Sequence, residues 1–346
     1  MMNRLRSQSG FSLAEVLVAT GLLLVVSSIV TSALLQLTKQ QQTIWNRTEM
    51  HSGVRGATEL LQQEVGQAGK ISLPGAVWVS AAPVTTIPEV FPFSPVCIVA
   101  SPILNSVAGM WVDPASNTGI ILTFLDGNNF ESVRVTAIDT ATRAITGCFW
   151  HNHAAGGAGV GAPVMAMGGF ANGIIPNSGV LNGSTANKLK LYGDINGDGL
   201  MKYVEYYCDN GDPGTAGSFN LYRHIVEFND APAVKTASYA SPNSKILLSN
   251  VHPNPPDSTG VARPCFQYQT VQLPAQGTVF TFVLDVAVTL TAWTQSIDPV
   301  TRQFQTETKA LLNVSPRNVF SAWALAGMGY TDRIQSTPGT VTALLP

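Results

Sequence analysis

The stretch FSLAEVLVATGLLLVVSSIVTSALLQLTK, residues 11–39, decides the fold because it contains the longest apolar run of the chain. Residues 16–37 form 22 consecutive positions without a charged side chain. A helix rises about 1.5 Å per residue, so this run is roughly 33 Å long and matches a hydrocarbon core of about 30 Å. The sequence therefore predicts a helix that is able to cross a membrane.

The helical pattern continues past the apolar run into a second, amphipathic half. Apolar side chains recur there at steps of three and four residues, which is the spacing of one helical face. They are Val54, Ala57, Leu61, Val65 and Ala68. The polar residues of the opposite face are Arg55, Glu59, Gln62 and Gln63. Gly66, Gly69 and Pro74 end the pattern, so we expect one helix from about residue 11 to residue 67.

Glu15 lies at the edge of the apolar run, and it allows two interpretations. Ser12 and Glu15 match the S-x-x-E capping box, in which two side chains satisfy backbone amides at a helix N-terminus. A carboxylate beside a membrane segment is also costly unless it finds a counter-charge. Cleavage between Gly10 and Phe11 would create an amine four residues away, and the amine of a neighbouring subunit would supply that charge.

A cleaved secretory signal is the simpler alternative for this N-terminus. Thr31 and Ala33 are small residues that suit a cut after Ala33. However, the apolar run exceeds the roughly 7–15 residues of an ordinary signal core, and the helical pattern does not stop with it. Both features favour a helix that stays on the mature chain.

The segment SGFSLAEVLVATGLLLVV follows a short leader that contains Arg4 and Arg6, and it resembles the type IV prepilin signal. The resemblance implies that a prepilin peptidase cuts after Gly10 and methylates Phe11. It also implies that Glu15 sets the register of subunits in a filament. The apolar half lacks the kinking proline of many major pilins. RGATELLQQEVGQAG and LLNVSPRNVFSAW are similar to segments of PilW-like minor pilins and J-type pseudopilins.

This resemblance implies a pilin-like α+β fold with a leader at residues 1–10, a transmembrane and assembly helix at 11–69, and a β-rich body at 70–346. The implied function is a minor pilin that assembles into, primes or caps a type IV pilus. The alternatives are a type II secretion pseudopilin and a tethered or secreted calcium-binding adhesion module. Expected partners are the prepilin peptidase and other major and minor pilins. The expected location is the inner membrane with a periplasmic body, and then a surface pilus or periplasmic pseudopilus.

Four cysteines follow the apolar segment, and no two of them form a CxxC pair. They are Cys97, Cys148, Cys208 and Cys265. Zinc-site spacing is therefore absent, and an exported body favours two disulfides. Four cysteines allow three pairings, of which proximity along the chain favours Cys97–Cys148 with Cys208–Cys265. Buried free thiols are the alternative.

The remainder of the chain indicates a β-rich body. Glycine (31 residues) and proline (21 residues) are frequent, as in turn-rich sheets. Residues 119–126 and 132–138 predict a hairpin, and the alternating run at 278–293 predicts a long strand paired with residues 302–314. We expect one mainly antiparallel sheet packed on the amphipathic half of the helix.

The motif DINGDGLMKYVE, which starts at residue 194, fits the calcium-loop pattern D-x-[DN]-x-[DN]-G-x5-E at every specified position. Side-chain oxygens would come from Asp194, Asn196 and Asp198. The backbone carbonyl of Leu200 and the carboxylate of Glu205 would complete the coordination. The sequence therefore predicts a structural calcium site.

Two features of this motif differ from a calcium-sensor loop. Lys202 stands where a water-linked oxygen ligand is common. The flanking segments KLKLYG and YVEYYCD indicate strands rather than helices. A tight turn between strands is thus the alternative interpretation, and bound calcium would pin a loop rather than open a helix pair.

Composition and motifs argue against nucleic-acid binding and against the common enzyme classes. Charged residues are 12% of the chain and the net charge is −2, so no basic surplus exists to neutralise phosphates. The HNH at residues 151–153 lacks a third ligand at metal-site spacing. GAGVGA at 157–162 is followed by a proline rather than a helix signature. We predict an assembly protein rather than an enzyme, with a tethered hydrolase as the third interpretation.

Overall fold

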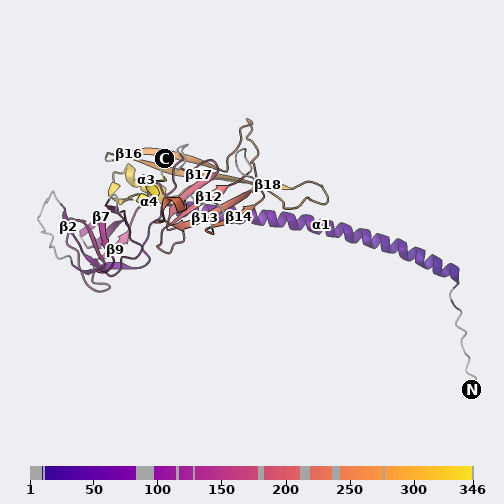
Figure 1. Cartoon of the computed structure of the whole chain (residues 1–346), viewed down its shortest axis with the longest axis horizontal. Coiled ribbons are helices and arrows are strands. Elements are labelled where there is room, and N and C mark those ends of the chain that lie inside the picture. The colour runs from indigo at the N-terminus through magenta and orange to yellow at the C-terminus, as the bar shows by residue number, and fades with distance from the viewer. Residues whose placement is uncertain are drawn as a thin grey trace, which may run out of the picture. The chain divides into compact units, whose positions relative to one another are not determined.

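The computed structural model describes residues 10, 12–82, 97–113, 117–127, 129–177, 183–210, 219–235, 242–275 and 277–344. It consists of one long N-terminal helix and a body made mostly of strands (Figure 1). The chain divides into two compact units. The first contains residues 1–52 and 293–306, and the second contains residues 53–292 and 307–346.

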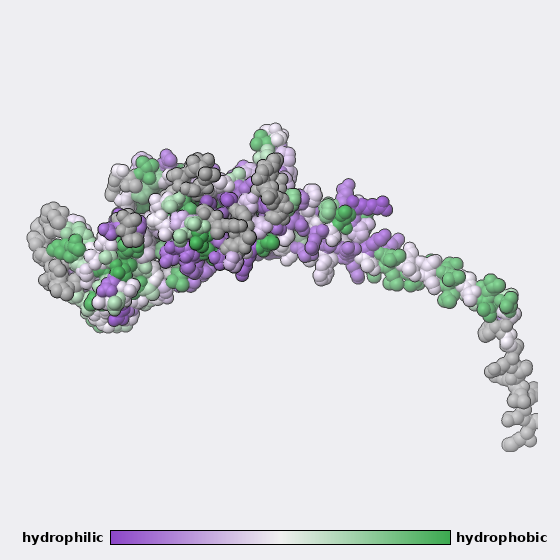
Figure 2. All heavy atoms as spheres, in the orientation of Figure 1, coloured by the Kyte–Doolittle hydropathy of each residue, from purple (hydrophilic) through white to green (hydrophobic). Residues whose placement is uncertain are grey.

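Helix α1 runs from Leu13 to Gln67 and has 55 residues, which confirms the predicted continuous helix. Phe11 lies outside the described residues. The large apolar side chains in the first half of α1 are exposed on every side of the helix. They form the green segments along α1 in Figure 2. By length and composition, α1 is the one helix among the described residues that can cross a membrane.

The second half of α1, together with Ala68 just after it, buries the predicted apolar stripe. Val54, Ala57, Leu61, Val65 and Ala68 are each at most 1% exposed. The predicted polar face is exposed at Arg55, Glu59, Gln62 and Gln63. Burial of each valine or leucine contributes about 1.5–3 kcal/mol, so tertiary packing stabilises this half far more than helix propensity does.

The helix ends where two glycine backbones touch. Gly69 has a φ of +76°, the left-handed conformation that commonly terminates a helix, and its N–H donates to the carbonyl of Tyr192 at 2.8 Å. A Cβ on Gly173 would lie 2.3 Å from the Cα of Gly69, closer than any side chain tolerates. The absence of side chains at these positions therefore lets the helix end lie directly against the backbone of the body.

Six strands of the body close into a barrel in the order β8-β3-β1-β9-β6-β7, with β7 pairing back to β8. Their bounds are β1 (Val77–Ala81), β3 (Ile103–Leu104), β6 (Ile121–Asp126), β7 (Asn129–Asp139), β8 (Ala144–Phe149) and β9 (Pro163–Ala166). Strand β2 (Ile98–Ala100) also pairs with β8. The barrel interior is apolar, with Leu122, Phe124 and Val135 fully buried.

The barrel corrects the expectation of one sheet packed on the helix. The predicted hairpin is confirmed, because β6 and β7 pair through Asp126 and Asn129. The register of the β7–β8 ladder shifts between Val135 and Ala137, and the β1–β3 ladder shifts between Val79 and Ala81. Such bulges bend strands and increase their twist, which allows a short-stranded sheet to curve round and close.

Two four-stranded antiparallel sheets make up most of the remaining strands. The first has the order β11 (Lys188–Gly193), β12 (Lys202–Cys208), β13 (Asn220–Glu227) and β14 (Ser244–Ser249). In the second, β17 (Thr278–Trp293) pairs with β15 (Val251–His252), β16 (Phe266–Ala275) and β18 (Thr306–Val314). The predicted long strand and its C-terminal partner are thus confirmed.

Short elements complete the described chain. They are the pair β4 (Val112–Asp113) and β5 (Thr118–Gly119), the parallel pair β10 (Gly169–Phe170) and β19 (Ile334–Gln335), the helices α2 (Pro232–Lys235), α3 (Arg317–Gly327) and α4 (Gly339–Thr342), and the 3-10 turn η1 (Thr331–Arg333).

A buried carboxylate fixes α1 to the β11–β14 sheet. Glu64 is 4% exposed, and both of its oxygens accept hydrogen bonds from the guanidinium of Arg223, one of them at 3.2 Å from Nε. The hydroxyl of Tyr206 donates to the same carboxylate. Burial alone would lower the pKa of Arg223, but the bonds to Glu64 raise it above its ordinary value. The bidentate pair therefore offsets the desolvation of both charges.

We predict that Glu64→Gln lowers the free energy of unfolding by about 3 kcal/mol, because it leaves the Arg223 guanidinium without its counter-charge. The matched control is Glu59→Gln on the same helix, whose partner Arg55 is exposed, and it should change stability little. Thermal and urea unfolding of the full chain in detergent would measure both. Equal effects of the two substitutions would contradict the anchoring role of Glu64.

Candidate functional site

The N-terminus of α1 carries the capping box predicted for Ser12 and Glu15. The Ser12 N–H donates to Oε2 of Glu15 at 2.9 Å, and the Glu15 N–H donates to Oγ of Ser12 at 3.2 Å. Among the described residues, Oε1 of Glu15 has no bonding partner. Gly10 is exposed, and the predicted methylation at Phe11 lies outside the described residues. One carboxylate oxygen thus caps the helix and the other is available.

In the first half of α1, the apolar side chains are exposed and no other described element packs against them. Leu13 is 84% exposed and Leu24 is 71% exposed, whereas Val54 and Leu61 on the second half are buried. Exposed apolar area costs about 25 cal/mol per Å² in water, and a continuous surface of this kind marks a membrane or protein contact. The first half of the helix therefore has a surface that suits lipid or other apolar helices.

The predicted calcium loop is the turn that joins β11 to β12. Gly193 pairs with Lys202 at the base of the turn, so Asp194, Asn196 and Asp198 all lie within it. The side chain of Asp198 accepts the Leu200 N–H at 2.9 Å, which is a bond inside the turn. The flanking segments are strands, as the sequence predicts.

Asp194 bonds the turn to the segment that follows α1. Its N–H donates to the Lys70 carbonyl at 2.9 Å, its carboxylate accepts from the Ser72 hydroxyl, and the Lys70 ammonium lies 3.4 Å away. A Cβ on Gly199 would lie 2.4 Å from the Pro74 nitrogen, so this glycine also serves the close packing. Both motif residues therefore have a structural role that needs no metal.

The ionisation of Asp194 follows from these contacts. Burial would raise its pKa, but the Ser72 hydroxyl and the Lys70 ammonium lower it overall. An acid whose folded-state pKa is lowered stabilises the fold above its unfolded pKa of about 4. That contribution is lost as the pH falls through the lowered value.

Glu205 lies in β12 rather than in the turn. It pairs with Lys190 in the ladder, three residues beyond the Gly193–Lys202 pair, which is about 10 Å along the strand. Its carboxylate lies 3.9 Å from the Lys188 ammonium and 4.0 Å from that of Lys190. The structure thus brings the first four predicted ligands into one turn. The fifth, Glu205, lies outside the turn, and its carboxylate is near two lysine ammonium groups. Calcium binding remains a prediction.

Both favoured disulfides are present. Cys97 pairs with Cys148 and joins the segment before β2 to β8. Cys208 pairs with Cys265 and joins the end of β12 to the segment before β16. The alternative of free thiols is therefore wrong in this structure. The cross-links close loops of 51 and 57 residues, and each stabilises the fold by about 4 kcal/mol in the chain-entropy model.

Two buried polar clusters were not predicted from the sequence. His153 is stacked on Phe124 in the barrel with ring centroids 4.9 Å apart, and its Nε2 lies 2.7 Å from Oε1 of Glu131. Glu131 also accepts the Trp150 N–H at 2.8 Å and the His151 N–H at 3.1 Å. The histidine motif alone gave no sign of this partner, because the acid comes from β7.

Lys235 forms the second cluster. It is fully buried, and its ammonium donates to the carbonyls of Asp230 at 2.7 Å and Thr340 at 3.3 Å, as well as to that of Phe228. Burial lowers the pKa of Lys235 to about 8. Across the described ranges, no three His, Cys, Asp or Glu side chains are grouped so as to hold a metal.

Comparison of the chain with models of known protein families, with curated proteins and with solved structures gave no match. Proposals about function therefore depend on the residues and geometry described above.

We predict that Asp194→Asn lowers the midpoint of thermal unfolding in excess chelator, because it removes the counter-charge of Lys70, whereas Asp198→Asn has little effect there. Added calcium should raise the midpoint of the wild type if the turn binds it, and Asp198→Asn should abolish that rise. An equal response of the wild type and Asp198→Asn to calcium would show that the turn is not the site.

Proposed function

We propose that the chain is a minor pilin that primes or caps a type IV pilus or a related filament. The observation that carries the proposal is the combination, on one helix, of a capped Glu15, an exposed apolar half and a second half packed into a β-rich body. An anchor with those properties can move from lipid into a bundle of similar helices without refolding. The order of Gly10, Phe11 and Glu15 supports prepilin processing.

The mechanism in this proposal is mechanical and electrostatic. A prepilin peptidase cuts after Gly10, and the new amine of Phe11 becomes the only cationic group of the mature chain before Lys39. In a bundle of helices, Oε1 of Glu15 accepts the amine of a neighbouring subunit while Oε2 still caps its own helix. The charge pair stabilises one register only, because a carboxylate without a partner is costly in an apolar environment.

A second part of the proposal concerns the β11–β12 turn. Calcium held by Asp194, Asn196, Asp198 and the Leu200 carbonyl would pin this turn in a periplasmic or extracellular body. The contacts of Asp194 with Ser72 and Lys70 support a turn that is already docked. The alternatives remain a type II secretion pseudopilin and a calcium-binding adhesion module. Both would have the same body. The pseudopilin would assemble in a different machine, and the adhesion module would not assemble through its helix.

Processing of the N-terminus gives the first test. We predict that mass spectrometry of the protein from membrane fractions finds a mature chain that begins with N-methylated Phe11, because the Gly10–Phe11 bond follows a basic leader and precedes the apolar helix. A mature chain that begins at Leu34 would mean that the apolar helix is removed, and the filament proposal would then be wrong.

Glu15→Gln separates capping from charge. Glutamine keeps the capping box, so we predict normal folding and cleavage. Incorporation into filaments should fall about tenfold or more below that of the wild type, since the amine of the neighbour loses its counter-charge. Glu49→Gln, an exposed acid further along α1, is the matched control. Immunoblotting of sheared filaments against membrane fractions measures incorporation. Wild-type incorporation of Glu15→Gln would overturn the registration role.

A further inference from the structure

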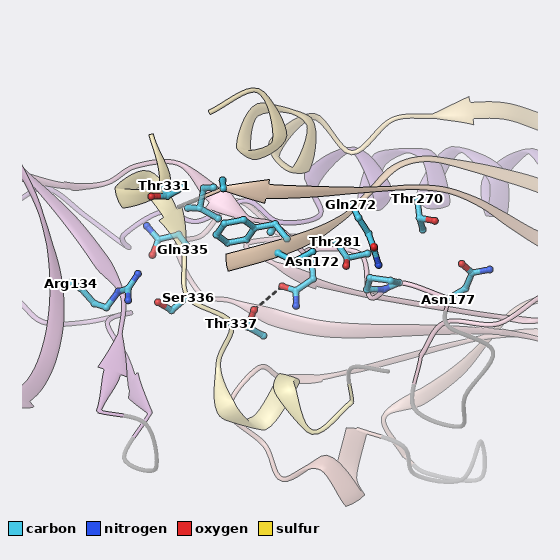
Figure 3. Close-up of a pocket in the computed structure, with 16 residues that line it drawn as sticks. Arg134, Asn172, Asn177, Thr270, Gln272, Thr281, Thr331, Gln335, Ser336 and Thr337 are labelled. Carbon is cyan, nitrogen blue, oxygen red and sulfur yellow. Dashed lines mark hydrogen bonds between the residues drawn. The ribbon is translucent and has the colours of Figure 1, made fainter. Parts of the chain in front are cut away.

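A groove of about 840 Å³ lies within the second unit of the chain. Its walls come from the β16–β17 hairpin, from residues 171–177 and from residues 331–337, and Arg134 reaches it from β7. Figure 3 shows Arg134 at one end and Thr270 and Asn177 at the other, with Asn172, Gln272 and Thr281 between them. The volume falls within the range of about 300–1,000 Å³ typical of small-molecule sites.

The lining of the groove is polar but almost without charge. Amides and hydroxyls dominate it, and Arg134 is its one ionisable side chain among the described residues. A site for a metal ion or a basic peptide would need carboxylates, and a site for a polyphosphate would need several cations. A purely apolar ligand would leave the amides and hydroxyls without partners, at a cost of about 1–3 kcal/mol for each buried group.

Several of these groups are free to bind a ligand. Gln272 and Thr281 face each other across the β16–β17 ladder, and within the described part of the chain neither side chain has a hydrogen-bond partner. Among the described residues, Asn172 forms hydrogen bonds only through Oδ1, which accepts from the Tyr192 hydroxyl at 2.7 Å and from the Thr337 hydroxyl at 2.9 Å. The second bond is drawn in Figure 3. The two amide donors of Asn172 therefore remain available.

One lining side chain, that of Gln335, already forms hydrogen bonds within the body, and these bonds hold one wall of the groove in place. The side chain of Gln335 accepts the Ile121 N–H at 2.8 Å and donates to the carbonyls of Ile121 at 2.9 Å and Met167 at 2.8 Å. This wall is thus bonded to the barrel over a separation of 214 residues. A ligand meets a preformed surface, which reduces the ordering cost of binding.

Among the described residues that line the groove, Arg134 is the only one with a charged side chain, and several others are apolar. The guanidinium is exposed and, among the described residues, has no ion pair, so its planar fork is available for a carboxylate. Val279 and Phe280 line the same groove, and Val279 is 62% exposed. This lining matches a sugar ring that carries one carboxylate. The hydrogen-bonding groups suit the sugar hydroxyls, the cation suits the carboxylate, and the apolar side chains suit the C–H face of the ring.

We propose that this groove binds an acidic saccharide, with the uronate carboxylate on Arg134 and the sugar hydroxyls on Gln272, Thr281 and Asn172. The inference is independent of the filament proposal, because it concerns the body alone and holds whether or not the N-terminus is processed as a prepilin. It adds a ligand to a surface for which the sequence motifs gave none.

The test is calorimetric titration of the full chain in detergent with a uronic acid disaccharide, and with the neutral disaccharide in which each carboxylate is reduced to a hydroxymethyl group. We expect the acidic sugar to bind at least tenfold more tightly than the neutral one. Arg134→Gln should remove that difference and leave the weaker binding of the neutral sugar unchanged. Arg263→Gln, another exposed arginine outside the groove, is the matched control and should keep wild-type affinities.

A second variant tests the hydrogen-bonding part of the site without changing any charge. Thr281→Val retains the shape of the side chain and removes its hydroxyl, so we expect about tenfold weaker binding of both sugars with the unfolding midpoint unchanged. The proposal is overturned if neither sugar binds. It is also overturned if Arg134→Gln and Arg263→Gln weaken the acidic sugar equally, or if Thr281→Val leaves both affinities as in the wild type.

Discussion

A single helix in two different environments is the constraint on which the rest of this structure depends. Along Leu13–Gln67 the backbone hydrogen bonds are continuous, yet the first half exposes its apolar side chains and the second half buries them. A helix of this kind needs a strong attachment on its buried half. The bidentate pair of Glu64 with Arg223, with Tyr206 as a third partner, supplies it in a setting where an unpaired charge would be strongly destabilising.

The body is held together mainly by contacts between residues far apart in the sequence. Gly69 and Gly173 let backbones meet at the end of the helix, and two disulfides join strand ends. Gln335 then bonds the C-terminal strand to the barrel at Ile121. Gln335 also lines the groove, so its bonds to Ile121 hold one wall of the groove in place before any ligand arrives.

Local patterns in the sequence predicted those elements whose form depends on near neighbours. The stripe that includes Val54 and Leu61 follows from helical periodicity, and the β6–β7 hairpin and long β17 follow from alternation and turn residues. Closure of the barrel was missed because it depends on bulges at positions such as Val135 and on pairings between distant strands. The groove was missed for the same reason, since only that topology brings Arg134 and Gln272 to the lining of one groove.

The calcium motif shows how a sequence pattern and a fold share residues. Asp194 and Gly199 satisfy the motif, but they also dock the turn on Lys70, Ser72 and Pro74 through contacts that need no metal. The motif's last acid is about 10 Å along the strand from the base of the turn, whereas calcium ligands lie within about 2.3–2.6 Å of the ion. A calcium ion in this turn would therefore need an oxygen ligand other than Glu205, such as water, to complete its shell.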